Sequence, residues 1–151
     1  MTKKIAFACD HRGFEVKTQI MAHLEAKGYK VVDCGTHSGE SCDYPDFMIA
    51  AASKVASGEC ERAIGVCYTG IGSSIVANKV AGVRASLCQT VKEAELTRAH
   101  NDSNMLILGS GVVNPDILLK LIDTWLETAF EGGRHERRVN KIKDYESKFC
   151  G

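Results

Sequence analysis

Short apolar runs alternate with amphipathic stretches along this chain, and no other feature constrains its fold as strongly. The gaps between the runs carry apolar residues at helical spacing, such as Val16, Ile20 and Leu24 ahead of Gly28. Strict alternation of strand and helix indicates a parallel sheet with helices on both faces. The β-rich runs occupy residues 5–9, 30–34, 63–67, 84–88 and 104–109.

Further helices are predicted where start signals precede apolar patterns. Pro45 opens one, residues 74–80 and 91–99 form two more, Asn114-Pro115 begins a fifth, and a last one follows Gly132-Gly133. We therefore expect an α/β fold, a three-layer α/β/α sandwich with a five-stranded parallel, Rossmann-like sheet and a C-terminal helix. Nothing marks an internal boundary, so we expect a single domain over residues 1–151.

The charge balance argues against some classes of partner. The 151 residues contain 19 Lys and Arg against 19 Asp and Glu, which gives a formal net charge of +0. Without a basic excess there is no electrostatic argument for a nucleic acid or a membrane surface as partner. The first apolar run is too short for a signal peptide, and no apolar stretch approaches membrane-spanning length, so we expect a cytoplasmic location.

The cysteines do not form a recognisable framework. There are seven, an odd number, and no C-x-x-C pair occurs among them. Disulfides and a zinc knuckle are therefore not expected, and we expect no metal site. Cys9, Cys34 and Cys88 each close a strand-like run, which suits buried packing, whereas only Cys67 is followed by a glycine turn.

That turn is the strongest candidate site in the sequence. An apolar run ends in Cys67, and a segment with Gly70 and Gly72 leads toward a helix. Free N–H groups at a helix N-terminus favour negative charge, which suits a nucleophile, or a base beside an anion site. The alternative is a small buried hydrophobe, because cysteine often serves as one.

Three familiar patterns fail at this turn. A dinucleotide fingerprint would need a third glycine where Ile75 stands, a low-molecular-weight phosphatase would need arginine at Ser73, and the Walker lysine is missing. What remains is a row of backbone N–H groups beside the hydroxyls of Thr69, Ser73 and Ser74. Such a row is suited to an oxyanion.

Other polar positions have both a functional and an ordinary interpretation. Asp10-His11 directly follows the first run and suits proton handling and anion contact, or else a capping Asp beside a surface His. His100-Asn101-Asp102 could be catalytic or a polar helix end. Arg134 and Arg138 share a helical face that can bind phosphate or simply be solvated. Tyr44, in a polar loop, could cover a site or merely pack.

Short motifs in a fixed order carry a resemblance that covers nearly the whole chain. The sequence resembles the type B ribose-5-phosphate isomerases and the related galactose-6-phosphate and allose-6-phosphate isomerases. The motifs are Cys9-Asp10-His11-Arg12-Gly13, Asp43-Tyr44-Pro45, Cys67-x-Thr69-Gly70-Ile71-Gly72, Ala77-Asn78-Lys79, His100-Asn101-Asp102-x-Asn104 and Glu131-Gly132-Gly133-Arg134-His135-x-x-Arg138.

The resemblance implies an aldose–ketose isomerase that works through an enediolate and uses no metal or organic cofactor. It implies that Cys67 moves the proton between C1 and C2 and that Thr69 helps to hold that edge of the sugar. His100, aided by Asp10 and Tyr44, would open the sugar ring. The other implied substrate contacts are Gly70, Ile71, Gly72 and Ser73 of the turn, the phosphate-binding His11, Arg134 and Arg138, and also Asn101 and Tyr68.

The resemblance also implies self-association. Members of the family typically form homodimers or dimers of dimers, with active sites completed across the subunit interface. The expected partners are therefore a small-molecule sugar phosphate and further copies of the chain. Two positions depart from the family pattern: Tyr68 stands where members usually carry glycine, and Gly111 stands where many carry another phosphate-binding arginine.

Three functions remain open at this point. The leading interpretation is interconversion of ribose 5-phosphate and ribulose 5-phosphate. A close alternative is the same chemistry on a six-carbon sugar phosphate, allose or galactose 6-phosphate. A different class is a non-catalytic module that binds a sugar phosphate or a nucleotide.

Overall fold

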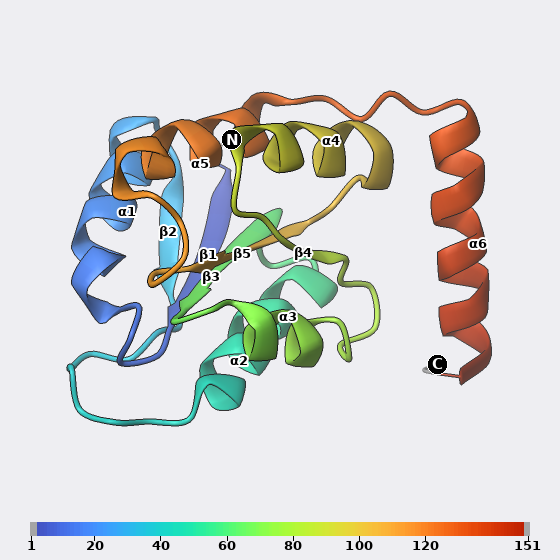
Figure 1. The fold of residues 1–151 in the computed structure, drawn as a ribbon. Helices are drawn as coiled ribbons and strands as arrows, with labels where there is room; N and C mark the ends of the chain where they lie inside the picture. Colours follow the sequence, from blue (N-terminus) through green and yellow to red (C-terminus); the bar gives the residue numbers. More distant parts are fainter. Residues whose placement is uncertain (1–2, 150–151) are drawn as a thin grey trace.

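A five-stranded parallel sheet forms the centre of the molecule (Figure 1). The structure is a computed structural model that describes residues 3–149. The strands are arranged in the order β2-β1-β3-β5-β4, so the direction of winding reverses between β1 and β3. In open sheets of this kind the ligand crevice lies beyond the carboxyl ends of the strands at that reversal. The strands are β1 (Lys4–Cys9), β2 (Lys30–Asp33), β3 (Arg62–Cys67), β4 (Ala85–Leu87) and β5 (Met105–Gly109).

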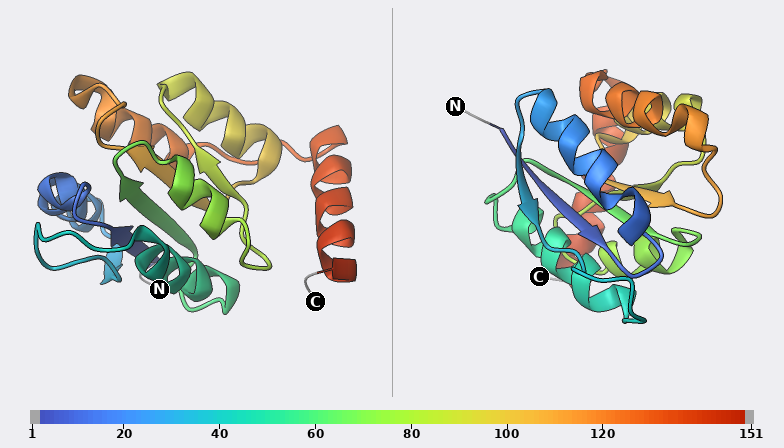
Figure 2. Two further views of the ribbon diagram at one scale, coloured as in Figure 1. Left: turned by 60° about the horizontal axis from the view of Figure 1, so that its bottom comes forward. Right: turned by 90° about the vertical axis from the view of Figure 1, so that its left-hand side faces the viewer.

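Helices cover both faces of the sheet, which confirms the predicted three-layer α/β/α sandwich (Figures 1 and 2). One layer holds α1 (Phe14–Ala26), α4 (Val91–Asn101) and α5 (Leu118–Glu127), which a short 3-10 turn over Pro115–Ile117 precedes. The other layer holds α2 (Tyr44–Ala56) and α3 (Ile71–Ala77).

Alternate side chains of the strands fill two separate cores, because successive side chains of a strand point to opposite faces. Ile5 and Phe7 of β1 pack with Trp125 of α5 on one face. Ala6 and Ala8 point to the other face, toward Met48 and its neighbours in α2. A fully buried large apolar side chain contributes about 1.5–3 kcal/mol, so the two cores hold the β1 and β3 ends in place.

The helix after Cys67 begins three residues earlier than expected. The sequence predicts it over residues 74–80, but α3 spans Ile71–Ala77. Gly70 makes the difference: its φ of 78° is in the left-handed region, so the chain turns in one residue and the helix starts directly after it. The glycine turn is therefore shorter than predicted, and Ile71, Gly72 and Ser73 form the first helical turn.

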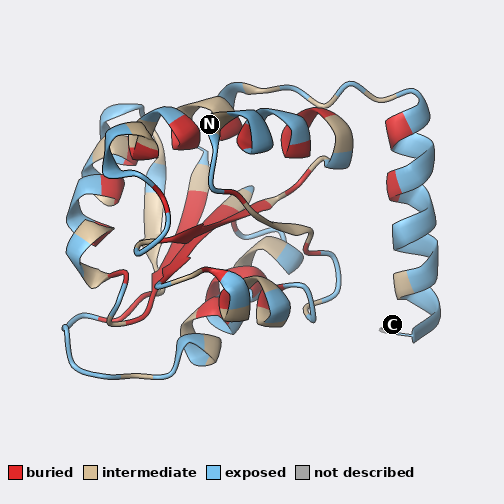
Figure 3. Ribbon diagram, in the orientation of Figure 1, coloured by how far each residue is buried: buried red, intermediate tan, exposed pale blue. Residues whose placement is uncertain are grey.

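The C-terminal helix stands apart from the sandwich. α6 (Arg134–Phe149) follows an extended segment and is exposed along most of its surface (Figures 1 and 3). Ile142, Tyr145 and Phe149 on this helix are 53%, 66% and 70% exposed, an apolar stripe that the sheet does not cover. Among the described residues, no helix combines the length and the apolar character that crossing a bilayer requires.

Candidate active site

Cys67 lies at the carboxyl end of β3, at the edge of the sheet where a ligand crevice is expected. Its side chain is buried, with 5% of the residue exposed. The backbone N–H of Gly70 donates to the Cys67 sulfur at 3.2 Å, and the N–H of Ile71 donates to the Thr69 hydroxyl at 3.2 Å. An N–H directed at sulfur stabilises negative charge there, which is the property a thiolate base or nucleophile needs.

Two glycines allow the turn to pack against the end of the neighbouring strand β5. A Cβ on Gly70 would overlap the side chain of Leu87, and it would lie 3.3 Å from the backbone nitrogen of Gly109. A Cβ on Gly109 would in turn lie 2.5 Å from the carbonyl oxygen of Thr69. The backbone around Cys67 is thus held from both sides.

The other strand-ending cysteines have the properties of packing residues. Burial raises the pKa of Cys9 to about 11 and the pKa of Cys88 to about 12. Burial also raises the pKa of Cys34 and of Cys60. These four thiols suit packing, whereas the Cys67 sulfur accepts the N–H of Gly70. Cys42 lies in the loop before α2, with its sulfur 3.9 Å from Nδ1 of His11. Cys150 lies outside the described residues.

Asp10 and His11 extend from the end of β1 into the same crevice. Asp10 is buried, and one of its carboxylate oxygens accepts the N–H groups of Arg12 at 2.9 Å and Gly13 at 3.2 Å. The backbone N–H of Cys42 donates to Nδ1 of His11 at 3.2 Å. Since Nδ1 accepts this hydrogen bond, the ring proton of neutral His11 lies on Nε2, where it is available to an anion.

Tyr44 and Ser73 lie at the α2–α3 side of the crevice. A Cβ on Gly72 would overlap the Tyr44 ring, so the ring lies directly on the first turn of α3. Ser73 is fully buried, and its hydroxyl has no hydrogen-bond partner among the described residues.

A cavity of about 540 Å³ is lined by two of the predicted site residues, His11 and Tyr68. Tyr68 forms part of its wall and is 51% exposed. The other residues that line it are His11, Arg12, Glu15, Val16, Gly39, Ser110 and Pro115. The sequence assigns no role to Arg12, which stands within a motif, to Ser110, which follows β5, or to Glu15 in the first turn of α1. A single charged or hydroxyl side chain carries no distinctive pattern.

The remaining predicted site residues form a second group at the opposite edge of the sheet. His100 and Asn101 end α4, which leads into the start of β5, whereas Cys67 pairs with the last residue of β5, Gly109. Arg134 begins the separate helix α6 beside the end of α4 (Figure 1). Within one chain the structure therefore brings Asp10, His11, Tyr44 and Cys67 together, but it does not bring His100, Asn101, Arg134 or Arg138 to them.

The rings of His100 and His135 are stacked in this second group. Their centroids are 4.1 Å apart and their planes differ by 7°. The backbone N–H of Glu131 donates to the carbonyl of Ala99 at 3.0 Å, which ties the extended segment to α4. Burial, together with the positive charges of His100 and Arg134, lowers the pKa of His135. His135 was part of a sequence motif, but no pattern assigned it a role.

The same group contains the only set of potential metal ligands found in residues 3–149. Ligand atoms of His100, Glu131 and His135 lie within 4.8 Å of one another. Nitrogen lone pairs lie in the plane of each ring, so two nearly parallel stacked rings direct them along parallel lines rather than at one ion. The arrangement suits a histidine pair beside a carboxylate better than a chelate.

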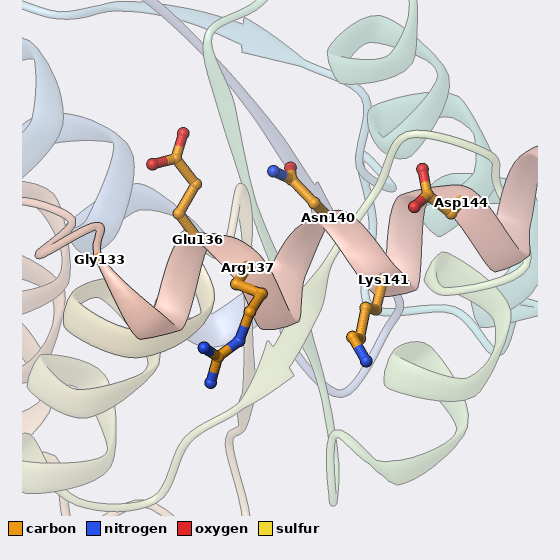
Figure 4. Close-up of a pocket in the computed structure, with 6 residues that line it drawn as sticks. All are labelled: Gly133, Glu136, Arg137, Asn140, Lys141 and Asp144. Carbon is orange, nitrogen blue, oxygen red and sulfur yellow. The ribbon is translucent and has the colours of Figure 1, made fainter.

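A hollow along α6 is not a second crevice. Its lining residues come from α6 and the glycine that precedes it: Gly133, Glu136, Arg137, Asn140, Lys141 and Asp144 (Figure 4). Two carboxylates and two cations of this one helix line the hollow, so their charges sum to zero.

Comparisons with known proteins agree with this geometry. A sequence model of the family described as Ribose/Galactose Isomerase matches residues 5–142. The chain is 47% identical to the Escherichia coli protein named ribose-5-phosphate isomerase B over 146 residues, 97% of this chain and 98% of that protein.

Solved structures match over the same extent. Ribose-5-phosphate isomerase B of Clostridium thermocellum is 49% identical, with a TM-score of 0.94 over 97% of this chain and 99% of that one. The Mycoplasma genitalium structure, described with bound ribulose-5-phosphate, is 41% identical, with a TM-score of 0.93 over 97% and 98% of the two chains. A match of this extent in both sequence and structure shows that the chain belongs to the ribose/galactose isomerase family.

Proposed function

We propose that this chain interconverts ribose 5-phosphate and ribulose 5-phosphate by proton transfer through an enediolate, with Cys67 as the base. The observation that carries the proposal is the thiol of Cys67 at the β3 end with the Gly70 N–H directed at its sulfur. The Escherichia coli relative is named for this activity, and the Mycoplasma genitalium relative is described with the ketose phosphate bound.

The chemistry requires a base and a site for the forming oxyanion. A C–H next to a carbonyl is a weak acid, so its removal is fast only where negative charge on oxygen is stabilised. Cys67 takes the proton from one carbon and returns it to the other. Thr69 holds the reacting edge. The N–H groups of Gly70 and Ile71 are already paired with Cys67 and Thr69. The backbone N–H groups of Gly72 and Ser73 bind the oxygen, since first-turn amides lack partners within the helix. Each such donor contributes about 2.7–4 kcal/mol in a preorganised site.

Ring opening and phosphate binding use the remaining groups. Ribose 5-phosphate is a cyclic hemiacetal, so a proton must leave its hydroxyl and reach the ring oxygen before isomerisation. We assign this step to His100, aided by Asp10 and Tyr44, and we assign phosphate binding to His11, Arg134 and Arg138, with Asn101 and Tyr68 as further contacts. The phosphate is remote from the reacting carbons, so its binding energy serves to position them.

We further propose that the chain acts as a homodimer or a dimer of dimers, with each site built from two copies. Two observations support this proposal. The proposed catalytic residues lie at opposite edges of the sheet of one chain, and apolar residues are exposed on α3 (Ile71, Ile75) as well as on α6. In a twofold dimer each surface meets its complement twice. The end of α4 in one copy can then supply His100, and α6 can supply Arg134 and Arg138, to the crevice of the other. The whole chain then works as a single domain in the cytoplasm.

A direct assay tests the proposed activity. Purified wild type and Cys67→Ala should be incubated with ribose 5-phosphate, allose 6-phosphate and galactose 6-phosphate, with the ketose product measured. We expect turnover of ribose 5-phosphate by wild type and a rate at least about 1000-fold lower in Cys67→Ala, as for loss of an essential base. If wild type prefers allose or galactose 6-phosphate, that sugar replaces ribose 5-phosphate as the proposed substrate. If wild type turns over none of the three sugars, the assignment as an enzyme is rejected.

A further inference from the structure

Tyr68 and Gly111 lie against each other at the cavity, although they are far apart in the sequence. A Cβ built on Gly111 would overlap the ring of Tyr68. The ring therefore occupies the space into which any side chain at position 111 would begin to project. A larger residue at 111 and the ring in its present place exclude each other.

The guanidinium of Arg12 lies over the ring of Tyr68. The central carbon of the Arg12 guanidinium lies 5.1 Å from the centroid of the Tyr68 ring. A cation in this position is attracted by the negative face of the ring, and a planar guanidinium stacks on it well. Among residues 3–149, no carboxylate forms an ion pair with Arg12.

The backbone of Arg12 is held on both sides. Its N–H donates to the buried carboxylate of Asp10 at 2.9 Å, and its carbonyl accepts the hydroxyl of Ser110 at 2.8 Å. The end of β1 and the loop after β5 are thus tied together at this residue. Both the origin and the head of the side chain are positioned before any ligand arrives, which lowers the entropy cost of binding.

The surroundings of Arg12 suit a phosphate. His11 and Arg12 both line the cavity of about 540 Å³, and His11 offers an Nε2 proton because its Nδ1 is occupied. A guanidinium and an imidazole N–H in the lining of one cavity match the acceptor oxygens of a phosphate dianion. Glu15 on the same wall carries a negative charge, which weakens the attraction of the cavity for an anion.

We propose that Arg12 binds the phosphate group of the sugar phosphate and that Tyr68 is the positioning residue that holds it there. This inference rests on the proposed function and identifies a further phosphate ligand of that site. It joins three positions into one arrangement: the ring of Tyr68 takes the space beside Gly111 and supports a guanidinium that reaches the cavity from the end of β1.

Replacement of the arginine gives the first test. We expect Arg12→Ala to raise KM for ribose 5-phosphate about 10- to 100-fold, the size of one lost hydrogen bond to a charged group, with kcat changed by less than about threefold. Inorganic phosphate, used as a competitive inhibitor, should lose affinity by the same factor. Lys30→Ala, which removes an exposed cation at the start of β2 on the far edge of the sheet, should change neither value.

Variants of Tyr68 separate positioning from packing. Tyr68→Phe keeps the ring that supports Arg12 and should raise KM less than Tyr68→Ala does. Tyr68→Ala removes the support for Arg12 and should raise KM several-fold, but it should add no further increase in an Arg12→Ala background. Equal KM increases in both backgrounds would show that Tyr68 acts independently of Arg12.

An exchange of positions tests the whole arrangement. Gly111→Arg alone should impair phosphate affinity, because the new side chain displaces the Tyr68 ring. Gly111→Arg combined with Tyr68→Gly frees that space. The phosphate affinity of this double variant should be at least about tenfold higher than that of Gly111→Arg alone. In this double variant the further change Arg12→Ala should matter less than it does in wild type.

The outcomes that oppose the inference are distinct from those that oppose the function. Unchanged KM and unchanged phosphate inhibition in an active Arg12→Ala variant would overturn the role of Arg12. If wild type turns over no sugar phosphate, the proposed function fails, and calorimetric titration with inorganic phosphate still decides the inference. Weaker binding of phosphate by Arg12→Ala than by wild type supports it, and equal binding refutes it.

Discussion

The backbone N–H of Gly70 donates to the sulfur of Cys67 at 3.2 Å, and Gly70 can do so because it adopts a left-handed conformation with φ of 78°. One glycine thus both ends the turn and points an amide at the proposed base. The same residue starts α3, whose first-turn amides face the proposed oxyanion position. The geometry of the base and of the anion site therefore depends on a single backbone conformation.

Gly70→Ala should lower both stability and kcat. We expect a loss of about 1–2 kcal/mol in the free energy of unfolding from the left-handed backbone, and a kcat at least about tenfold lower because the amide moves away from Cys67. Gly58→Ala is a matched control, since Gly58 has the same φ of 78° with no atom near its added Cβ. Urea denaturation should show a loss in both variants, and steady-state kinetics should show a loss in Gly70→Ala alone. Equal kcat values in the two variants would contradict the role of the Gly70 amide.

Gly72→Ala should act through Tyr44, because the added methyl group overlaps the Tyr44 ring. We expect Gly72→Ala and Tyr44→Ala each to reduce kcat/KM, and the double variant to be no worse than the more damaging single one. Contacting residues are coupled in this way, whereas independent sites add their effects. Kinetics on the three variants measures the coupling, and full additivity would show that Tyr44 works elsewhere.

The stability of the fold should fall in alkaline solution, in part because of Cys88. Burial raises its pKa from 9.0 to about 12, so the folded protein keeps the proton that the unfolded chain loses above pH 9. The unfolded state then binds fewer protons, and stability decreases as the pH rises from about 9 toward 12. Cys88→Ala removes this contribution. The difference in unfolding free energy between wild type and Cys88→Ala, measured by urea denaturation, should narrow from pH 8 to pH 10.5, and a constant difference would oppose this account.

Acid should destabilise the contact between α6 and α4. The pKa of His135 is lowered by burial and by His100 and Arg134, so the folded protein favours neutral His135. The unfolded chain takes up a proton near its ordinary value of 6.5, and the stability contribution is complete above that pH and declines as the pH falls. His135→Phe keeps an aromatic ring without a titrating group. Wild type should lose more unfolding free energy than His135→Phe between pH 7 and pH 5.5; an equal loss would point to other groups.

The fold could be predicted because its strongest signals are local. Buried parallel strands appear as short apolar runs, and the runs ending in Cys9, Cys67 and Gly109 match the ends of β1, β3 and β5. The start of α3 was missed because a glycine in the left-handed region, rather than the serine at 74, begins that helix. The sequence shows that a glycine is present at position 70, but not that this glycine adopts a left-handed backbone conformation.

The candidate site could be predicted in part. Asp10 and Cys67 follow neighbouring strands, so topology alone brings them together. The sequence predicts His100 and Arg134 as residues of the same site as Cys67. Only the structure shows that, within one chain, they lie at the opposite edge of the sheet from Cys67. Arg12 stands within a sequence motif but receives no role from it, because its significance depends on the ring of Tyr68, which the fold brings against it from a distant position in the sequence.

The central claim is that one active site combines Cys67 of one copy with His100 of another, and a mixture of two inactive variants tests it most directly. Cys67→Ala and His100→Ala should be purified separately, mixed in equal amounts, unfolded and refolded together, and assayed with ribose 5-phosphate. If each site uses two copies, half of the dimers are hybrids with one intact site, and the mixture should regain about a quarter of wild-type activity. Activity no higher than that of the separately refolded variants, from hybrids shown to have formed, would contradict the account.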